Sequence, residues 1–233
     1  MLSQNSIETT LLAYKGDSTL KEAMLREVAK HRKADQIEQG HYGRENGTWK
    51  GCAVACSLRS LAIVNKEPLV TKYDQHGRYE DDLGIPEAIA YLEDRIFEGL
   101  PKEKAVLWPE RFLKAIQPGA DLSLVIPRFI VWLMGDVRQY VKGYPGVEKA
   151  LDTVAGLYQR VIGGWVVTGA EWNAAAWAAR EAAWAAREAA WAARAAWAAR
   201  AAKAAAWAAR AASYESMADK LIELLEMAPV GGK

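Results

Sequence analysis

Apolar residues recur at helical spacing through much of the chain, and the first clear case follows the polar residues 1–17. The positions that share one helical face there are Leu20, Ala23, Met24, Val28 and Ile37. Thr19 and Glu22 have the spacing of a capping box, so we expect this helix to start there and to run to about Gln39. Gly40 then stands where a helix end favours positive φ.

Further helices are predicted downstream by three prolines, each near the start of a helical pattern, where a missing N–H costs least. They are Pro86, Pro101 and Pro109. The preceding residues 67–83 mix β-branched and turn residues, which indicates a short hairpin or an irregular crossing.

The most apolar run of the chain, LSLVIPRFIVWLM, follows Asp121. We expect Asp121 to cap this helix and Pro127 to kink or start it. Its apolarity predicts that it is the central helix of the core. Another helix should end at Gly163.

Trp-Ala-Ala-Arg repeats dominate the C-terminal part, where residues 174–212 hold 26 alanines. Alanine has the highest helix propensity and no Gly or Pro interrupts the run, so we predict one long helix, roughly 60 Å in length. Thr168 and Glu171 have the spacing of a capping box at its start. The predicted domains are a helical globular domain at 1–167 and a repeat helix at 168–228 that packs on it or projects from it.

Two interpretations of the repeats stay open: a structural helix whose tryptophans pack on the domain, or a docking surface for a partner helix, an extended ligand or stacked bases. Each arginine follows its tryptophan by three residues, which allows the guanidinium to stack on the indole. The predicted partner-binding residues are Trp177, Arg180, Trp184, Arg187, Trp191 and Arg194. The alanine face would also allow self-association into a homo-oligomer.

Composition narrows the class of protein. The 233 residues include 30 Lys plus Arg and 29 Asp plus Glu, for a formal charge of +1. A neutral balance argues against duplex nucleic acid as the main partner, because that affinity needs clustered basic residues. The chain shows neither a signal-peptide pattern nor a long uncharged apolar run. We therefore expect a soluble protein of the cytoplasm with no membrane partner.

Residues 40–51, GHYGRENGTWKG, hold four glycines and cannot form a helix, so we expect a loop. Backbone N–H groups, basic side chains and aromatic rings together suit a phosphate-bearing, nucleotide-like small molecule. The predicted ligand-binding residues are His41, Tyr42, Arg44, Trp49 and Lys50. Nucleotide-binding, dinucleotide-binding and zinc-protease motifs are lacking from the sequence, so no cofactor is expected.

Cys52 and Cys56 open the apolar helix that follows the loop. They are either small buried hydrophobes or, for Cys52, a nucleophile whose thiol pKa the helix N-terminus lowers. A Gly-containing loop before a helix-opening Cys resembles the nucleophile helix of papain-like cysteine hydrolases, although the Gln that family has upstream is missing. That resemblance implies a cysteine-dependent hydrolase or transferase with His41 or His76 as base. A lone C-x3-C does not fit the common zinc spacings, so no metal is predicted.

Three segments, KGCAVACSL, LGIPEAIAYLEDRIFEGLP and WPERFLKAI, together with the Ala-Trp-Arg repeats, are similar to uncharacterised proteins of bacteriophages and their bacterial hosts. The resemblance implies a viral or prophage origin, with the host cytoplasm as location, and brings no known activity. The sequence thus predicts an all-α, non-enzymatic binding protein that acts on a host component through a small nucleotide-like ligand or a host protein. The cysteine-dependent enzyme is the alternative.

Overall fold

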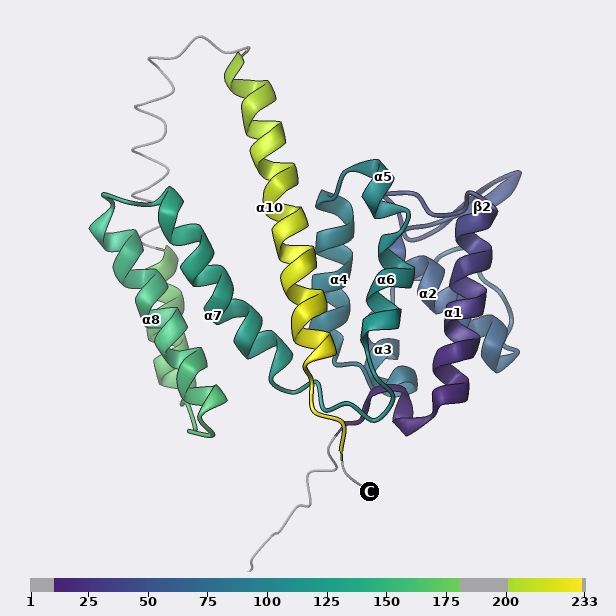
Figure 1. Cartoon of the computed structure of the whole chain (residues 1–233), viewed down its shortest axis with the longest axis horizontal. Helices are drawn as coiled ribbons and strands as arrows, with labels where there is room; N and C mark the ends of the chain where they lie inside the picture. Colours follow the sequence, from purple (N-terminus) through teal and green to yellow (C-terminus); the bar gives the residue numbers. More distant parts are fainter. Residues whose placement is uncertain (1–10, 181–200, 232–233) are drawn as a thin grey trace, which may run out of the picture. The chain divides into compact units, whose positions relative to one another are not determined.

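The computed structural model describes residues 11–180 and 201–231, and confirms the all-α prediction (Figure 1). A two-stranded sheet interrupts the helices in this part of the chain. The helices and strands are η1 Ala13–Gly16, α1 Ser18–Lys33, β1 Arg44–Asn46, β2 Thr48–Lys50, α2 Ala53–Asn65, α3 Gly77–Leu83, α4 Glu87–Gly99, α5 Lys102–Ala105, α6 Trp108–Ala115, α7 Val125–Val137, η2 Arg138–Tyr140, α8 Pro145–Ile162 and α10 Ala201–Glu226. Residues 169–180 are also helical. Within the described ranges, none of the helices has both the length and the apolar character needed to cross a membrane.

The chain forms two units, and the first is built from both ends of the described sequence. Unit 1 contains the described residues up to Ser123 and those from Leu221 onward, and unit 2 contains those from Leu124 to Lys220. The domain boundary predicted after residue 167 therefore lies inside unit 2. Backbone hydrogen bonds join the two parts of unit 1: the Asp121 N–H donates to the Pro229 carbonyl at 2.8 Å.

Helix α2 is the centre of unit 1, and nine of its residues between Ala53 and Ala62 are buried. It contacts α1, α4 and α6. Its many small side chains let these neighbours approach closely. The expectation that α7 would be the central helix is wrong, because α7 lies in unit 2 and most of its apolar residues after Phe129 are only half-buried. How deeply a helix is buried depends on how many elements surround it, so the apolarity of its sequence does not by itself predict its burial.

Helix α1 differs from its prediction at both ends. Its N-cap is Asp17, whose carboxylate accepts a hydrogen bond from the Thr19 N–H at 2.7 Å, so Thr19 is not the cap. The helix ends at Lys33 and not near Gln39, because Asp35 takes a positive φ of 52°. The chain then runs beside Gly51, whose N–H donates to the carbonyl of residue 36 at 2.9 Å.

The segment 67–83 contains no hairpin: residues 67–76 are irregular and α3 follows. The three prolines do stand at or just before the first turns of α4, α5 and α6, as predicted. Asp121 does not cap α7. Its carboxylate accepts from the Ser123 N–H at 2.9 Å in a turn, and α7 begins at Val125 with Pro127 in its first turn.

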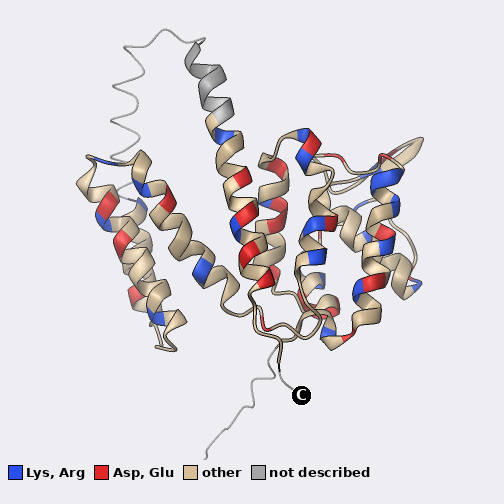
Figure 2. Cartoon of the chain, viewed as in Figure 1, with Lys and Arg blue, Asp and Glu red and all other residues tan. Residues whose placement is uncertain are grey.

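In unit 2, α7 packs beside α8, which ends before Gly163 as predicted (Figure 1). Arg138 binds Asp152 through two nitrogens, at 2.5 and 2.8 Å. Both signs of charge are interspersed along α1 and along α8 (Figure 2), in keeping with the balanced composition.

The capping box at Thr168 is confirmed: the Thr168 N–H donates to Glu171 at 2.8 Å, and the Glu171 N–H donates back to the Thr168 hydroxyl at 3.3 Å. The predicted long helix is helical at 169–180 and again in α10. The rest of that prediction, at 181–200, lies outside the described residues.

Candidate functional site

The glycine-rich segment forms the hairpin of β1 and β2, with Arg44 paired to Lys50. Gly47 at its turn has a φ of 83°, which glycine adopts at little cost. Gly43 has a φ of 124°, and a Cβ there would lie 2.0 Å from the Thr71 carbonyl oxygen. The prediction that this segment is not a helix is confirmed, and the close approach of its backbone to Thr71 accounts for one of its glycines.

Cys52 is the N-cap of α2, one residue before the first helical turn. Its N–H donates to the His41 carbonyl at 2.9 Å, which ties the end of the loop to the start of the helix. Its side chain is buried, as is that of Cys56, whose thiol donates to the Gly51 carbonyl at 3.4 Å. Burial raises the pKa of both thiols, and nearby carboxylates reinforce this. The lowered thiol pKa expected from the helix N-terminus is therefore wrong for Cys52.

Asp94, on α4, interacts with Tyr42, His76 and Cys52, and these four residues form one cluster. Its carboxylate oxygen Oδ2 accepts a hydrogen bond from the Tyr42 hydroxyl at 2.7 Å and lies 3.4 Å from His76 Nε2. Burial alone would raise the pKa of Asp94, but the interactions with His76 and Tyr42 outweigh it and hold that pKa below its ordinary value. The Cys52 thiol contributes in the same direction. A carboxylate is therefore held in a largely buried place.

His76 is fixed in orientation by rings on two sides. It stacks on Tyr91 with ring centroids 4.1 Å apart and meets the edge of Tyr42 at 5.6 Å. Its Nδ1 lies 3.3 Å from the Asp74 carbonyl, which can only accept, so Nδ1 carries a proton. Nε2 is the atom that faces Asp94.

Glu98 lies one helical turn beyond Asp94 and borders the same cluster. Its Oε1 accepts from the Gly40 N–H at 3.0 Å. Burial, and to a smaller extent Asp94, raise the pKa of Glu98. The side chain therefore couples the glycine-rich segment to α4.

The sequence reasoning missed a fully buried carboxyl on α4, that of Glu93. Within the described residues neither of its oxygens has a hydrogen-bond partner, and the same holds for the Tyr79 and Ser57 hydroxyls. Burial raises the pKa of Glu93 to about 8. The helical spacing of Ile89, Glu93 and Ile96 would have revealed it, because that spacing places Glu93 on the apolar face of its helix.

The basic members of the predicted ligand-binding set lie against carboxylates. His41 Nε2 lies 3.1 Å from a Glu38 oxygen, and Arg44 binds the same oxygen at 2.5 Å. Lys50 pairs with Asp35 at 2.8 Å. The basic groups of this segment are therefore engaged by carboxylates.

Trp49 and Tyr42, the two aromatic members of that set, are anchored inside the fold. Trp49 is buried, donates from its ring nitrogen to the Thr71 carbonyl at 2.8 Å, and has the Arg59 guanidinium 4.5 Å from its ring centre. Tyr42 is the residue that donates to Asp94. Both rings hold the hairpin against the rest of unit 1.

Of the residues proposed for catalysis, His76 and Cys52 both border Asp94, whereas His41 lies against Glu38. Among the hydrogen bonds of the described residues, neither ring is bonded to the Cys52 thiol. A buried thiol with a raised pKa and no histidine bonded to it does not favour the cysteine-dependent alternative.

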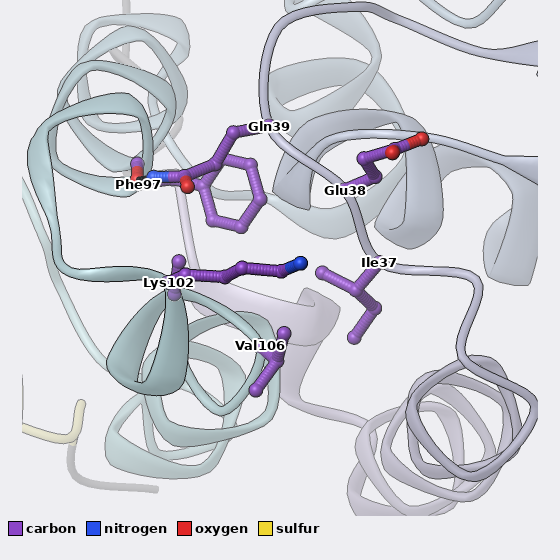
Figure 3. A pocket seen from close by; sticks show the side chains of 7 residues that line it. Ile37, Glu38, Gln39, Phe97, Lys102 and Val106 are labelled. Carbon is purple, nitrogen blue, oxygen red and sulfur yellow. Dashed lines mark hydrogen bonds between the residues drawn. The ribbon is translucent and has the colours of Figure 1, made fainter.

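A pocket of about 170 Å³ opens beside this cluster, between the segment before the hairpin and the α4–α5 region (Figure 3). Figure 3 shows the Lys102 side chain extending across it toward Ile37, with the Phe97 ring on one side and Val106 on the other. The Gln39 amide is committed to backbone, since it donates to the Phe97 and Leu100 carbonyls at 2.7 and 3.0 Å. The full lining is Ile37, Glu38, Gln39, Phe97, Lys102, Ala105 and Val106.

Two of the predicted partner-binding residues are described. Trp177 is 65% exposed and Arg180 is exposed, both at the end of the helical residues 169–180. The others, Trp184, Arg187, Trp191 and Arg194, lie outside the described residues. Partner binding by this set stays a prediction.

The chain was compared with known proteins at the level of family, sequence and fold. No family model, curated protein or solved structure matches it. The similarity to bacteriophage proteins stays a prediction for the same reason. Any function must therefore be argued from the chemistry of these residues.

Proposed function

We propose that the protein is a non-enzymatic binding protein whose pocket holds a small anionic molecule of the phosphate-monoester class. The observation that carries this proposal is the placement of Lys102. Its side chain lines the pocket, and no ion pair of its ammonium is found within the described residues. A cation in a concave site attracts an anion that supplies the missing partner.

The one carboxylate in the lining does not cancel that charge. Glu38 is held by Arg44 and His41, and the hydrogen bond from Arg44 holds the pKa of Glu38 below its ordinary value. Figure 3 shows its carboxylate directed away from Lys102. The ammonium is thus the charged group that an incoming ligand meets.

The walls of the pocket set the size and character of the ligand. Phe97, Ile37 and Val106 offer an aromatic face and aliphatic surface. A volume of about 170 Å³ is below the several hundred Å³ common for drug-sized ligands. A phosphate group with a short or planar attachment suits this space, and the remainder of a nucleotide would extend out of it.

The test is calorimetric titration of the full chain with adenosine monophosphate, ribose 5-phosphate and inorganic phosphate. We expect saturable binding of at least one of the three and a loss of at least tenfold in affinity in Lys102→Met, because the charge-assisted contact is removed. Lys104→Met is the matched control, since Lys104 belongs to the same short helix and does not line the pocket. Absence of saturable binding, or equal losses in both variants, would refute the proposal.

A further inference from the structure

A second site is indicated where the start of α2 lies against α4, and the side chains of one cysteine and two acidic residues converge there. Cys52, Asp94 and Glu98 each offer one ligand atom, and all these atoms lie within 4.8 Å of one another. Asp94 and Glu98 are four residues apart on α4, so they project from the same face of that helix. Cys52 approaches them from the start of α2.

His76 supplies the independent observation that a ligand belongs there. Its side chain is 3% exposed, and its Nε2 has no hydrogen-bond partner within the described residues. The same atom points at the cluster, 3.4 Å from Asp94 Oδ2. A buried ring nitrogen without such a partner is costly, and a bound cation would satisfy it.

A hydrogen bond to the backbone orients the His76 ring and leaves one ring nitrogen available to a metal. Nδ1 donates to the Asp74 carbonyl, which leaves Nε2 as the nitrogen that offers its lone pair in the neutral ring. Metal-binding histidines usually have their second nitrogen held in this way. The stacking of Tyr91 on the imidazole keeps that orientation.

We propose that the zinc cluster, defined as Cys52, His76, Asp94 and Glu98, binds one zinc ion. Zinc accepts thiolate sulfur, imidazole nitrogen and carboxylate oxygen together, in tetrahedral geometry. In such a site neighbouring ligand atoms are about 3.3 to 3.7 Å apart. The separation of His76 Nε2 and Asp94 Oδ2 already has this value. The ligand atoms of Cys52, Asp94 and Glu98 lie within 4.8 Å of one another, so side-chain movements would complete the tetrahedron.

The charges of the cluster favour a divalent cation. Two carboxylates and a thiol have their ligand atoms within 4.8 Å of one another, and their anionic forms would repel one another at this distance. Zinc binding removes that conflict: Cys52 coordinates as the thiolate and its proton passes to solvent. Glu98 is the exposed member, so the ion would enter from its side.

Such a site would be structural. The ion would join three segments: the start of α2, the residue just before α3, and α4. The usual sequence signals of zinc do not report it, because the four ligands come from three separate segments with no shared spacing.

The experiment uses the full chain, freed of metal with a chelator and titrated with zinc against a competing indicator. We expect one zinc per chain and a loss of at least tenfold in affinity in both Cys52→Ser and His76→Gln. The matched controls are Cys56→Ser and His31→Gln, which alter a buried cysteine and a buried histidine outside the cluster and should retain zinc. Failure of the unaltered chain to bind zinc, or retained affinity in Cys52→Ser or His76→Gln, overturns the proposal.

Cobalt provides a second measurement that does not depend on the folding of the variants. In the unaltered chain, bound Co²⁺ should give thiolate-to-cobalt charge-transfer absorption and the intense visible bands of tetrahedral coordination. An octahedral cobalt spectrum without the charge-transfer band refutes a site that includes Cys52. Loss of zinc from the control variants as well would assign that loss to unfolding, and the cobalt spectrum of the unaltered chain then decides whether Cys52 is a ligand.

Discussion

Gly84, which follows α3, occupies a position that tolerates no side chain. Its φ is 64°, and a Cβ there would lie 2.0 Å from the carbonyl oxygen of Leu12. Two costs therefore combine at one residue: the left-handed backbone conformation and a clash with backbone that cannot move aside.

Gly84→Ala should lower the free energy of unfolding by about 3 kcal/mol or more, measured by urea denaturation. Gly47→Ala separates the two costs, because Gly47 also has positive φ, of 83°, but has open space around it. That variant should lose only about 1 to 2 kcal/mol. Equal losses in the two variants would show that the approach to Leu12 is not restrictive.

At the scale of elements, the helix at 169–180 is held at its start by one carboxylate. Glu171 accepts hydrogen bonds from Arg160 and from Thr168, and these lower its pKa from the ordinary 4.5 to about 2. A lowered pKa in the folded state means that the stabilisation is present above pH 4.5 and is lost as the pH falls from 4.5 toward 2.

An NMR titration of the side-chain carboxyl carbons tests this directly. The Glu171 signal should titrate near pH 2, and in Arg160→Gln its midpoint should rise toward the ordinary value because the first of its partners is lost. A wild-type midpoint near 4.5 would mean that the capping box and the pair with Arg160 do not form in solution.

Several elements could be predicted from local signals, and the mispredicted ones depended on distant contacts. The prolines before α4 to α6 and the capping box at Thr168 act through the backbone next to them, so the sequence reports them. The end of α1 was predicted too late in the chain because residues 36–38 pair with Gly51, a contact that no local sequence pattern encodes.

The candidate site was predictable only in part, for the same reason. Cys52 and His76 were singled out by their residue types, whereas no local pattern distinguishes Asp94 or Glu98. Their roles depend on the packing of α4 against α2, which brings carboxylates to the start of another helix. The pocket residue Lys102 gave no sequence signal at all.

At the scale of the whole molecule, the C-terminal segment belongs to the core of unit 1. Leu221 and Leu225 are fully buried and lie in unit 1. Leu225→Ala should therefore lower the free energy of unfolding of unit 1 by about 2 to 5 kcal/mol. Met227→Ala, at a side chain that is 66% exposed, should change it by about 0.5 kcal/mol or less.

Chemical denaturation followed by the NMR signal of the Trp108 indole N–H, a residue buried in unit 1, would measure both variants. If Leu225→Ala behaves like Met227→Ala, the last turns of α10 do not contribute to this core.

The chain leaves unit 1 and re-enters it at one place. The Gly231 N–H donates to the Gly119 carbonyl at 3.1 Å, and Ala120 forms a bridge with Val230, so exit and return are fastened together. Unit 2, from Leu124 to Lys220, lies between these fastenings as an insertion with closed ends. Copies of the Trp-Ala-Ala-Arg repeat could accumulate or disappear there over evolutionary time while the pocket and helix α2 keep their shape. A lineage would then vary its repeat length freely and its binding residues hardly at all.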